Sequence, residues 1–288
     1  MAVILWGGNA VVAKLSAAVI SPADVTFFRW LVAALLLAPF AAGPILRHRA
    51  ELKPQLPRMI ILGLLGCALF SYLMYVAAGH TTATNIGIIQ TLMPLIAIGL
   101  SGVLFGFAIS VGSVAGTLIS LLGVVIVVCQ GSFDLLVSHP PNKGDLMMLV
   151  ATVCFALYSV LLARWRSLLP LSISLFVQSC TAVVALLPVI LLAPHAAMEP
   201  EALPLIAYAG ALGSVAAPLL WMGGIARIGS ARASIFFNLL PLVTAALAIL
   251  LLGEPLTLPL IFGGLLALVG VVMAERASKS AAARLAGL

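Results

Sequence analysis

The sequence predicts an all-α membrane protein with ten transmembrane helices, arranged as two inverted five-helix repeats. Three observations lead to this fold class. The chain is 64% hydrophobic and only 8% charged, whereas a typical soluble domain carries about 25% charged residues. Its second half repeats its first, and nearly all of its basic residues fall on one side of the predicted spans. Because so few charges cannot cover a core of this size in water, a soluble fold is excluded.

The repeat is clearest in one stretch without gaps. Residues 92–125 align with residues 239–272, an offset of 147, and twelve of the 34 aligned positions are identical. Matched prolines and glycines in an apolar chain are typical of membrane proteins built from two related halves. The matched pairs include Pro94/Pro241, Gly106/Gly253, Gly116/Gly263 and Gly123/Gly270.

A shorter match precedes this one. Residues 6–9 align with residues 155–158 at an offset of 149. The two matches together place the first repeat at residues 1–132 and the second at residues 133–288.

Ten apolar runs of about 18–23 residues are long enough to cross a bilayer as helices. Their hydrophobicity is continuous rather than alternating, which favours helices over the strands of a barrel. Prolines at three expected helix starts fit this reading, because a missing N–H is harmless there (Pro22, Pro170, Pro204). The predicted spans are 2–20, 23–43, 58–78, 83–104, 109–129, 144–163, 171–193, 202–222, 231–252 and 257–275.

The basic residues set the orientation through the positive-inside rule. With the N-terminus in the cytoplasm, the inner loops and tail hold eleven basic residues and the outer loops hold only Lys143. Five spans per repeat is an odd number, so the second half enters the membrane in the opposite sense. We therefore expect an inverted repeat with both termini cytoplasmic, in a bacterial inner (plasma) membrane. The inner basic residues are Arg47, Arg49, Lys53, Arg58, Arg164, Arg166, Arg227, Arg232, Arg276, Lys279 and Arg284.

Neither catalysis nor a bound metal or cofactor is indicated. An intramembrane enzyme needs a nucleophile with its base, or a metal site, at mid-membrane. The cysteines have no metal-ligand spacing, the histidines lie at loops or span ends, and no phosphate-binding loop occurs. We expect no enzyme activity, cofactor or nucleic-acid partner; an enzyme and a non-transporting scaffold remain open as minor alternatives. The sequence sets no oligomeric state. The residues concerned are Cys67, Cys129, Cys154, Cys180, His48, His80, His139 and His195.

Several short motifs occur in a fixed order over nearly the whole chain, and together they resemble the EamA-like family of the drug/metabolite transporter superfamily. The resemblance implies export or exchange of small metabolites, often amino acids, through a cavity between the halves. The motifs are Trp6-Gly-Gly-Asn9 with Lys14, Ser21-Pro22, Arg29 in the second span, and Leu-Leu-Gly-Glu254-Pro followed by Gly263 and Gly270-Val-Val.

One position departs from that family. The first repeat has Phe107 where the family usually has a Glu after Gly, as in Gly253-Glu254. We therefore do not expect Glu254 to form half of a symmetric pair. The glycines of the fifth and tenth spans suit close helix packing rather than a substrate site (Gly112, Gly116, Gly123, Gly263, Gly264, Gly270).

Candidate substrate-binding residues are the polar and aromatic side chains within the spans. Polar groups are costly in hydrocarbon, so those present tend to face a cavity or another helix. The alternative remains open for each residue, because amides also join helices by hydrogen bonds and aromatic rings also pack or anchor at the interface. The predicted set is Asn9, Lys14, Arg29, Tyr75, Gln90, Thr91, Tyr158, Trp221 and Asn238.

Away from the span ends, Lys14 and Arg29 are the only basic residues within the predicted spans. Together they would attract a carboxylate; alternatively, Lys14 reaches the outer surface and Arg29 pairs with Asp24. Pro94 and Pro241 each free a carbonyl within a span, which predicts kinked helices beside the cavity.

The predicted function is export or exchange of small metabolites, with amino acids preferred, by alternating access between the repeats. The spans offer amides, hydroxyls, aromatic rings and two cations but no mid-membrane acid. This inventory suits a small solute that carries a carboxylate, and it disfavours proton antiport through a buried acid. Efflux of amphipathic drugs or cations is the alternative. The expected partners are a small-molecule substrate and the lipid bilayer.

Overall fold

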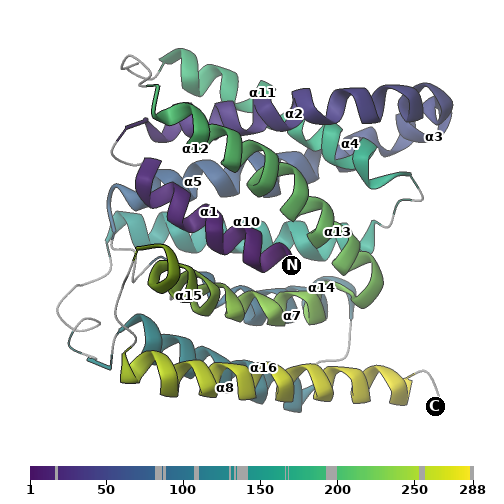
Figure 1. The fold of residues 1–288 in the computed structure, drawn as a ribbon. Helices are drawn as coiled ribbons and strands as arrows, with labels where there is room; N and C mark the ends of the chain where they lie inside the picture. The colour runs from purple at the N-terminus through teal and green to yellow at the C-terminus, as the bar shows by residue number, and fades with distance from the viewer. Residues whose placement is uncertain are drawn as a thin grey trace.

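A computed structural model of the chain forms a bundle in which every described element is helical (Figure 1). The structure describes residues 1–16, 19–81, 86, 89–106, 110–129, 131–132, 134, 142–165, 167, 169–192, 200–252 and 257–285. Within these ranges it leaves out some side chains, those of residues 10, 14, 128, 231, 245, 248, 251–252, 275 and 278–285.

The first half begins with a short helix and a long one, followed by a segment that changes its helical type twice. Its elements are α1 (Ala2–Ser16), α2 (Pro22–Arg47), α3 (Arg49–Leu52), the 3₁₀ turn η1 (Lys53–Gln55), α4 (Leu56–Leu62), the π-helical η2 (Gly63–Leu69), α5 (Phe70–Ala78), α7 (Met93–Phe105) and α8 (Val111–Val128).

The second half has the same order of long and broken helices. Its elements are α10 (Lys143–Arg164), α11 (Leu171–Leu192), α12 (Ala202–Tyr208), the π-helical η3 (Ala209–Ala216), α13 (Ala217–Ile228), α14 (Ser230–Ile235), the 3₁₀ turn η4 (Phe236–Leu239), α15 (Leu240–Leu252) and α16 (Leu258–Leu285). Each half therefore contains one π-helical segment, a feature that the apolar pattern of the sequence did not predict.

Five helices are long and apolar enough to cross a membrane by length and composition, and the shorter apolar helices have 10–17 residues. The long ones are Pro22–Arg47, Arg49–Ala78, Lys143–Arg164, Leu171–Leu192 and Ala202–Ile228. Three helices run at least four residues past the ends of the predicted spans, since α2 continues to Arg47, α13 to Ile228 and α16 to Leu285. The residues added to α16 are mostly Ala, Arg, Lys and Leu, which all favour helix.

The prediction that Pro94 and Pro241 kink helices from within is wrong in detail. Both are the second residue of a helix, α7 and α15. A turn at Thr91 and Leu92 precedes α7, and η4 precedes α15. Each proline therefore starts a helix, because the first helical turn requires no N–H from the ring nitrogen.

Two pairs of helices flank the bundle, α2 with α11 at one end and α8 with α16 at the other (Figure 1). The members of each pair occupy corresponding places in the two halves. The α8–α16 pair is antiparallel, because successive glycines of α8 face successively earlier residues of α16. A Cβ added at Gly112 would lie 2.8 Å from Ala277 Cβ, and one at Gly116 or Gly123 would lie within 3.0 Å of the Ala274 or Ala267 backbone.

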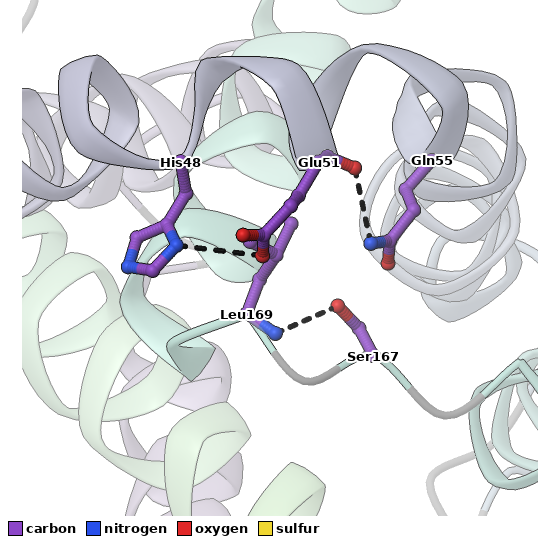
Figure 2. Close-up of polar contacts among 5 residues, drawn as sticks. All are labelled: His48, Glu51, Gln55, Ser167 and Leu169. Carbon is purple, nitrogen blue, oxygen red and sulfur yellow. Dashed lines mark hydrogen bonds and ion pairs between the residues drawn. The ribbon is translucent and has the colours of Figure 1, made fainter.

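The connection after α2 and the connection before α11 lie side by side at one end of the bundle (Figure 2). His48 Nδ1 lies 3.4 Å from Glu51 Oε2, and Gln55 Nε2 donates to the Glu51 carbonyl oxygen at 3.1 Å. The Leu169 N–H donates to Ser167 Oγ at 3.0 Å. A small apolar cluster joins the two connections through Leu52, Met59, Leu169 and Ile173.

Candidate functional site

The buried side chain of Arg29 organises a polar cluster between α2, α5 and η3. It lies two turns into α2 and is 4% exposed. Its Nε donates to Ser214 Oγ at 2.8 Å, and Nη1 donates to Tyr75 Oη at 3.1 Å. The guanidinium carbon lies 5.7 Å from the Trp30 ring centroid and 5.9 Å from that of Tyr75. Among the described residues these neutral groups are its partners, and no carboxylate forms an ion pair with it.

Asn9 approaches Arg29 over Gly213. A Cβ built on Gly213 would lie 2.6 Å from Asn9 Oδ1 and 3.1 Å from Arg29 Nη2. Asn9 Oδ1 and Arg29 Nη2 therefore both lie close to the same point above Gly213. Asn9 is 7% exposed, and its Oδ1 accepts no hydrogen bond from any described group. Since burial of an unsatisfied acceptor is costly, this atom is suited to accept a hydrogen bond from a ligand.

The π-helical turn η3 presents Gly213 and Ser214 to this cluster. The Ser214 hydroxyl donates to the Ala209 carbonyl oxygen, five residues earlier, at 2.9 Å and accepts from Arg29. The Gly213 carbonyl oxygen accepts from Trp6 Nε1 at 3.1 Å. Wide helical turns of this kind occur frequently at functional sites. We call Asn9, Arg29, Tyr75, Gly213 and Ser214 the Arg29 cluster.

Four aromatic rings adjoin this cluster and contact one another. Trp6, Phe155, Trp221 and Phe237 have ring centroids 5.5–6.1 Å apart. We call these four residues the aromatic quartet. Trp6 joins it to the Arg29 cluster, because its indole N–H donates to the Gly213 carbonyl. Trp6 and Phe155 come from the first and second halves of the chain and align with each other in sequence, so the quartet brings both halves together.

Most of the predicted site residues lie in or beside these two groups. Asn9, Arg29 and Tyr75 belong to the Arg29 cluster. Trp221 belongs to the quartet and donates from Nε1 to Ser159 Oγ at 3.3 Å. Tyr158 lies beside the quartet, with its ring centroid 5.5 Å from that of Phe155.

The other predicted residues lie elsewhere. Asn238 is fully buried, and its Nδ2 donates to Ser120 Oγ of α8 at 3.1 Å. Gln90 Nε2 lies 3.6 Å from Met74 Sδ. Thr91 is buried in the turn before α7. Lys14 lies in α1, but its side chain is outside the described residues, as are Phe107 and Glu254.

Arg29 does not take the partner that the sequence suggested. Its contacts are Ser214 and Tyr75, whereas a carboxylate oxygen of Asp24 accepts from the Ser21 hydroxyl at 2.7 Å. Ser21 caps α2, and Asp24 lies in its first turn, which explains their pairing.

The sequence reasoning missed Gly213, Ser214, Phe155 and Phe237 as members of a site. Small residues carry no signal of their own, and Phe is ordinary in a membrane span. Only the alignment of Trp6 with Phe155 in the two repeats marked one of these positions. Among the described residues, no three His, Cys, Asp or Glu side chains gather as metal ligands.

Comparison with known proteins now identifies the family. The model of the EamA-like transporter family matches residues 1–129 and 142–275. The chain belongs to this family. The resemblance seen in its motifs is therefore confirmed, and the protein is an integral membrane protein of a transporter family. An EamA-like protein is built to carry a small molecule, so the Arg29 cluster is a candidate for contact with that molecule.

Individual EamA-like relatives cover almost the whole chain. An uncharacterized transporter of Bacillus subtilis, YyaM, is 28% identical over 281 residues, which are 94% of this chain and 90% of that protein. An uncharacterized transporter of Archaeoglobus fulgidus is 26% identical over 285 residues, 95% of this chain and 94% of its own. A probable terminal-alkyne amino-acid exporter of Streptantibioticus cattleyicolor is 25% identical over 261 residues, 88% of this chain and 84% of its own.

One solved crystal structure has the same fold. Its TM-score is 0.76 over 97% of this chain and 95% of that chain, with 19% sequence identity. At this identity the likeness concerns the fold alone.

Proposed function

We propose that this EamA-like protein carries small metabolites with a carboxylate, amino acids first among them, by export or exchange. The observation that carries the proposal is the buried guanidinium of Arg29, whose described partners are neutral hydroxyls and rings. A buried charge is costly unless an opposite charge compensates it. A carboxylate of the substrate is the compensating group that the described part of this site lacks.

The transport mechanism that we propose is alternating access between two inverted repeats of five spans each. Its support is the match of one family model to residues 1–129 and to residues 142–275. The corresponding helices α8 and α16 are also antiparallel, as an inversion requires. The strong bias of basic residues further supports ten spans with cytoplasmic termini in an inner membrane.

The proposed substrate-binding set centres on the Arg29 cluster and includes the aromatic residues beside it. Arg29, Asn9 and Tyr75 would contact the polar end of the solute, and Tyr158 and Trp221 its apolar part. Lys14, Gln90, Thr91 and Asn238 remain candidates for contact as the two repeats move.

Amino acids are preferred among carboxylates for two reasons. One relative is named a probable amino-acid exporter, at 25% identity. The Arg29 cluster also offers a free acceptor, Asn9 Oδ1, beside a cationic donor. Amphipathic cations are disfavoured, because a cation would meet the positive charge of Arg29 at short range.

We propose that coupling to protons through a mid-membrane acid plays no part. The acidic side chains that the structure describes lie in first helical turns or in connections: Asp24, Glu51, Asp134, Asp145 and Glu201. Exchange, or transport down a gradient, needs no such acid.

Counterflow from liposomes tests the proposal. Purified protein is reconstituted, the vesicles are loaded with one unlabelled amino acid, and uptake of its labelled form is followed. We expect trans-stimulated uptake for at least one amino acid and none for amphipathic cations, without an imposed pH gradient. Uptake of cations alone, or uptake that strictly requires a pH gradient, would overturn the assignment.

A further inference from the structure

The Arg29 cluster has a counterpart in the other repeat, and the residues of the two differ in kind. The helices α2 and α11 begin at residues 22 and 171, so Arg29 corresponds to Gln178. Residues 63–66 and 210–213 share the pattern Gly-x-Leu-Gly at the offset of 147, so Gly213 corresponds to Gly66 and Ser214 to Cys67. The same offset pairs Tyr75 with Met222, and the earlier alignment pairs Asn9 with Tyr158. The contacts agree, because Asn9 lies over Gly213 and Tyr158 lies over Gly66.

The counterpart region has no described charged side chain and is largely filled by an aromatic ring and apolar side chains. The Tyr158 ring packs directly onto Gly66, where an added Cβ would lie 2.6 Å from Tyr158 Cδ2. Cys67 and Ala68 belong to a buried apolar cluster that also contains Trp30 and Leu175. Gln178, which takes the place of Arg29, donates to Ser174 Oγ of its own helix at 2.9 Å. Among the described residues, a buried cation with polar partners therefore occupies only one of these two corresponding places, the one in the Arg29 cluster.

We propose that this single site recognises the head group of an α-amino acid and that Gly213 is its specificity-determining residue. The inference rests on the proposed transport function. Arg29 binds the substrate carboxylate, and Asn9 Oδ1 accepts a hydrogen bond from the substrate ammonium. Gly213 positions both groups, since its missing Cβ allows the amide and the guanidinium to converge on one point.

The chemistry of an α-amino acid matches this pair of groups. Its ammonium and carboxylate are attached to the same carbon, so one head group reaches a donor and an acceptor that lie close together. The carboxylate compensates the buried guanidinium, and the ammonium satisfies the free oxygen of Asn9. A carboxamide keeps the ammonium but loses the anion, and a deaminated acid keeps the anion but loses the donor. Each analogue leaves one buried group of the site unsatisfied.

Gly213 also offers a clean substitution. The nearest atoms that an added methyl would meet are Asn9 Oδ1, Asn9 Cγ and Arg29 Nη2, which are the ends of side chains and not backbone. Gly213→Ala therefore displaces the two recognition groups while the helices keep their packing. Gly224 lies in α13, in the same unbroken helical segment, and an added Cβ there meets nothing within 4 Å. Gly224→Ala is the matched control.

The test compares substrates and variants in reconstituted vesicles. The twenty common amino acids are screened as counterflow drivers, and the best driver is compared with its carboxamide and its deaminated acid. We expect both analogues to compete about tenfold or more weakly, the factor for one lost charge-assisted hydrogen bond. Gly213→Ala should raise the half-saturation concentration by a similar factor, and Gly224→Ala should leave it unchanged.

A second measurement is independent of transport. The best driver should raise the unfolding temperature of detergent-solubilised wild type and Gly224→Ala, and raise it much less in Gly213→Ala and in Arg29→Gln. The last variant introduces the residue that occupies this place in the second repeat.

The outcomes separate the two proposals. If no amino acid drives counterflow, the proposed amino-acid transport fails, and this inference fails with it. If an amino acid drives counterflow but its carboxamide competes equally well, transport stands and the head-group site is wrong. An unchanged half-saturation concentration in folded Gly213→Ala would likewise remove Gly213 as a specificity determinant.

Discussion

Arg29 is held in an apolar bundle by neutral partners, and each partner engages a different part of its guanidinium. Ser214 and Tyr75 accept hydrogen bonds, and the rings of Trp30 and Tyr75 lie within cation–π distance. Such contacts partly replace the hydration that the charge loses, but they do not neutralise it. The residue is therefore retained at a cost in stability, which is typical of functional charges within membranes.

Replacing Tyr75 by Phe tests this account at one atom. Tyr75→Phe removes the hydroxyl that accepts from Arg29 Nη1 and keeps the ring. We expect a loss of about 1.5–3 kcal/mol in unfolding free energy, as for a hydrogen bond to a charged group, together with weaker binding of carboxylates. Thermal unfolding in detergent and counterflow measure the two effects. Tyr72→Phe is the control, because the half-buried Tyr72 hydroxyl makes no hydrogen bond to a described residue; equal losses in the two variants would refute the role of Tyr75.

Asn238 has two open interpretations, contact with the solute or a hydrogen bond that only joins helices, and two variants can separate them. Its Nδ2 donates to Ser120 Oγ across η4 and α8, while its Oδ1 has no described partner. We expect Asn238→Leu to reduce flux while the protein stays folded, because it removes a buried acceptor that has no described partner. Ser120→Ala removes the helix-to-helix hydrogen bond but keeps the amide, so it should change stability more than flux. If Asn238→Leu leaves flux unchanged, the amide joins helices only.

At the scale of elements, the contact between α8 and α16 depends on glycines that allow the two backbones to approach. A Cβ on Gly123 would lie within 3.0 Å of the backbone of Gly263 and Ala267, and one on Gly270 equally close to Gly116 and Ser120. The residues that Gly123 contacts in α16 align in sequence with the residues that Gly270 contacts in α8, so the two sets of contacts correspond. The sequence predicted close packing for six glycines of these two spans. The structure agrees for all of them except Gly264, where an added Cβ would make only an ordinary contact.

Gly123→Ala should therefore be strongly destabilising. The added methyl meets backbone atoms that cannot move aside without separating the helices, so we expect a loss of about 1–3 kcal/mol or more. Gly264→Ala in α16 is the matched control, since its nearest neighbour would be Leu242 Cδ2 at 3.6 Å, an ordinary contact. The measurement is the unfolding temperature of both variants in the same detergent. Similar temperatures for the two would contradict the close packing.

Other features of the elements were not accessible from sequence. The apolar pattern located the helices but gave no sign of η2 or η3, since a π-helical turn changes which carbonyl each N–H reaches without changing residue type. Gly213 and Ser214 became part of a site only because η3 presents them to Arg29. In the same way, the position of Pro94 within an apolar run suggested a kink, whereas the preceding turn makes it the start of α7.

At the scale of the whole molecule, the similarity of the two halves predicts the fold, and the positions where they differ bear on the candidate site. The repeat and the basic residues predicted an inverted arrangement from the chain alone, and the family assignment is confirmed. The proposed substrate site depends instead on where the two halves differ, as with Arg29 and Gln178. Those differences involve residues far apart in sequence, and no local pattern reports that Arg29, Asn9 and Gly213 meet. The repeat thus predicts the helical scaffold, whereas the residues proposed to select the substrate can be identified only from their three-dimensional contacts.

The inverted arrangement itself can be tested by crosslinking α8 to α16. A Cβ at Gly112 lies 2.8 Å from Ala277 Cβ, close enough for a disulfide after a small adjustment. In a chain whose native cysteines are replaced, we expect Gly112→Cys with Ala277→Cys to crosslink readily under mild oxidation in membranes. Gly112→Cys with Leu258→Cys should not crosslink, because Leu258 begins α16 at the opposite end of an antiparallel pair. Proteolysis between the halves followed by gel electrophoresis detects the bond. Crosslinking of the second pair and not the first would mean that α8 and α16 are parallel, and alternating access between inverted repeats would then have to be abandoned.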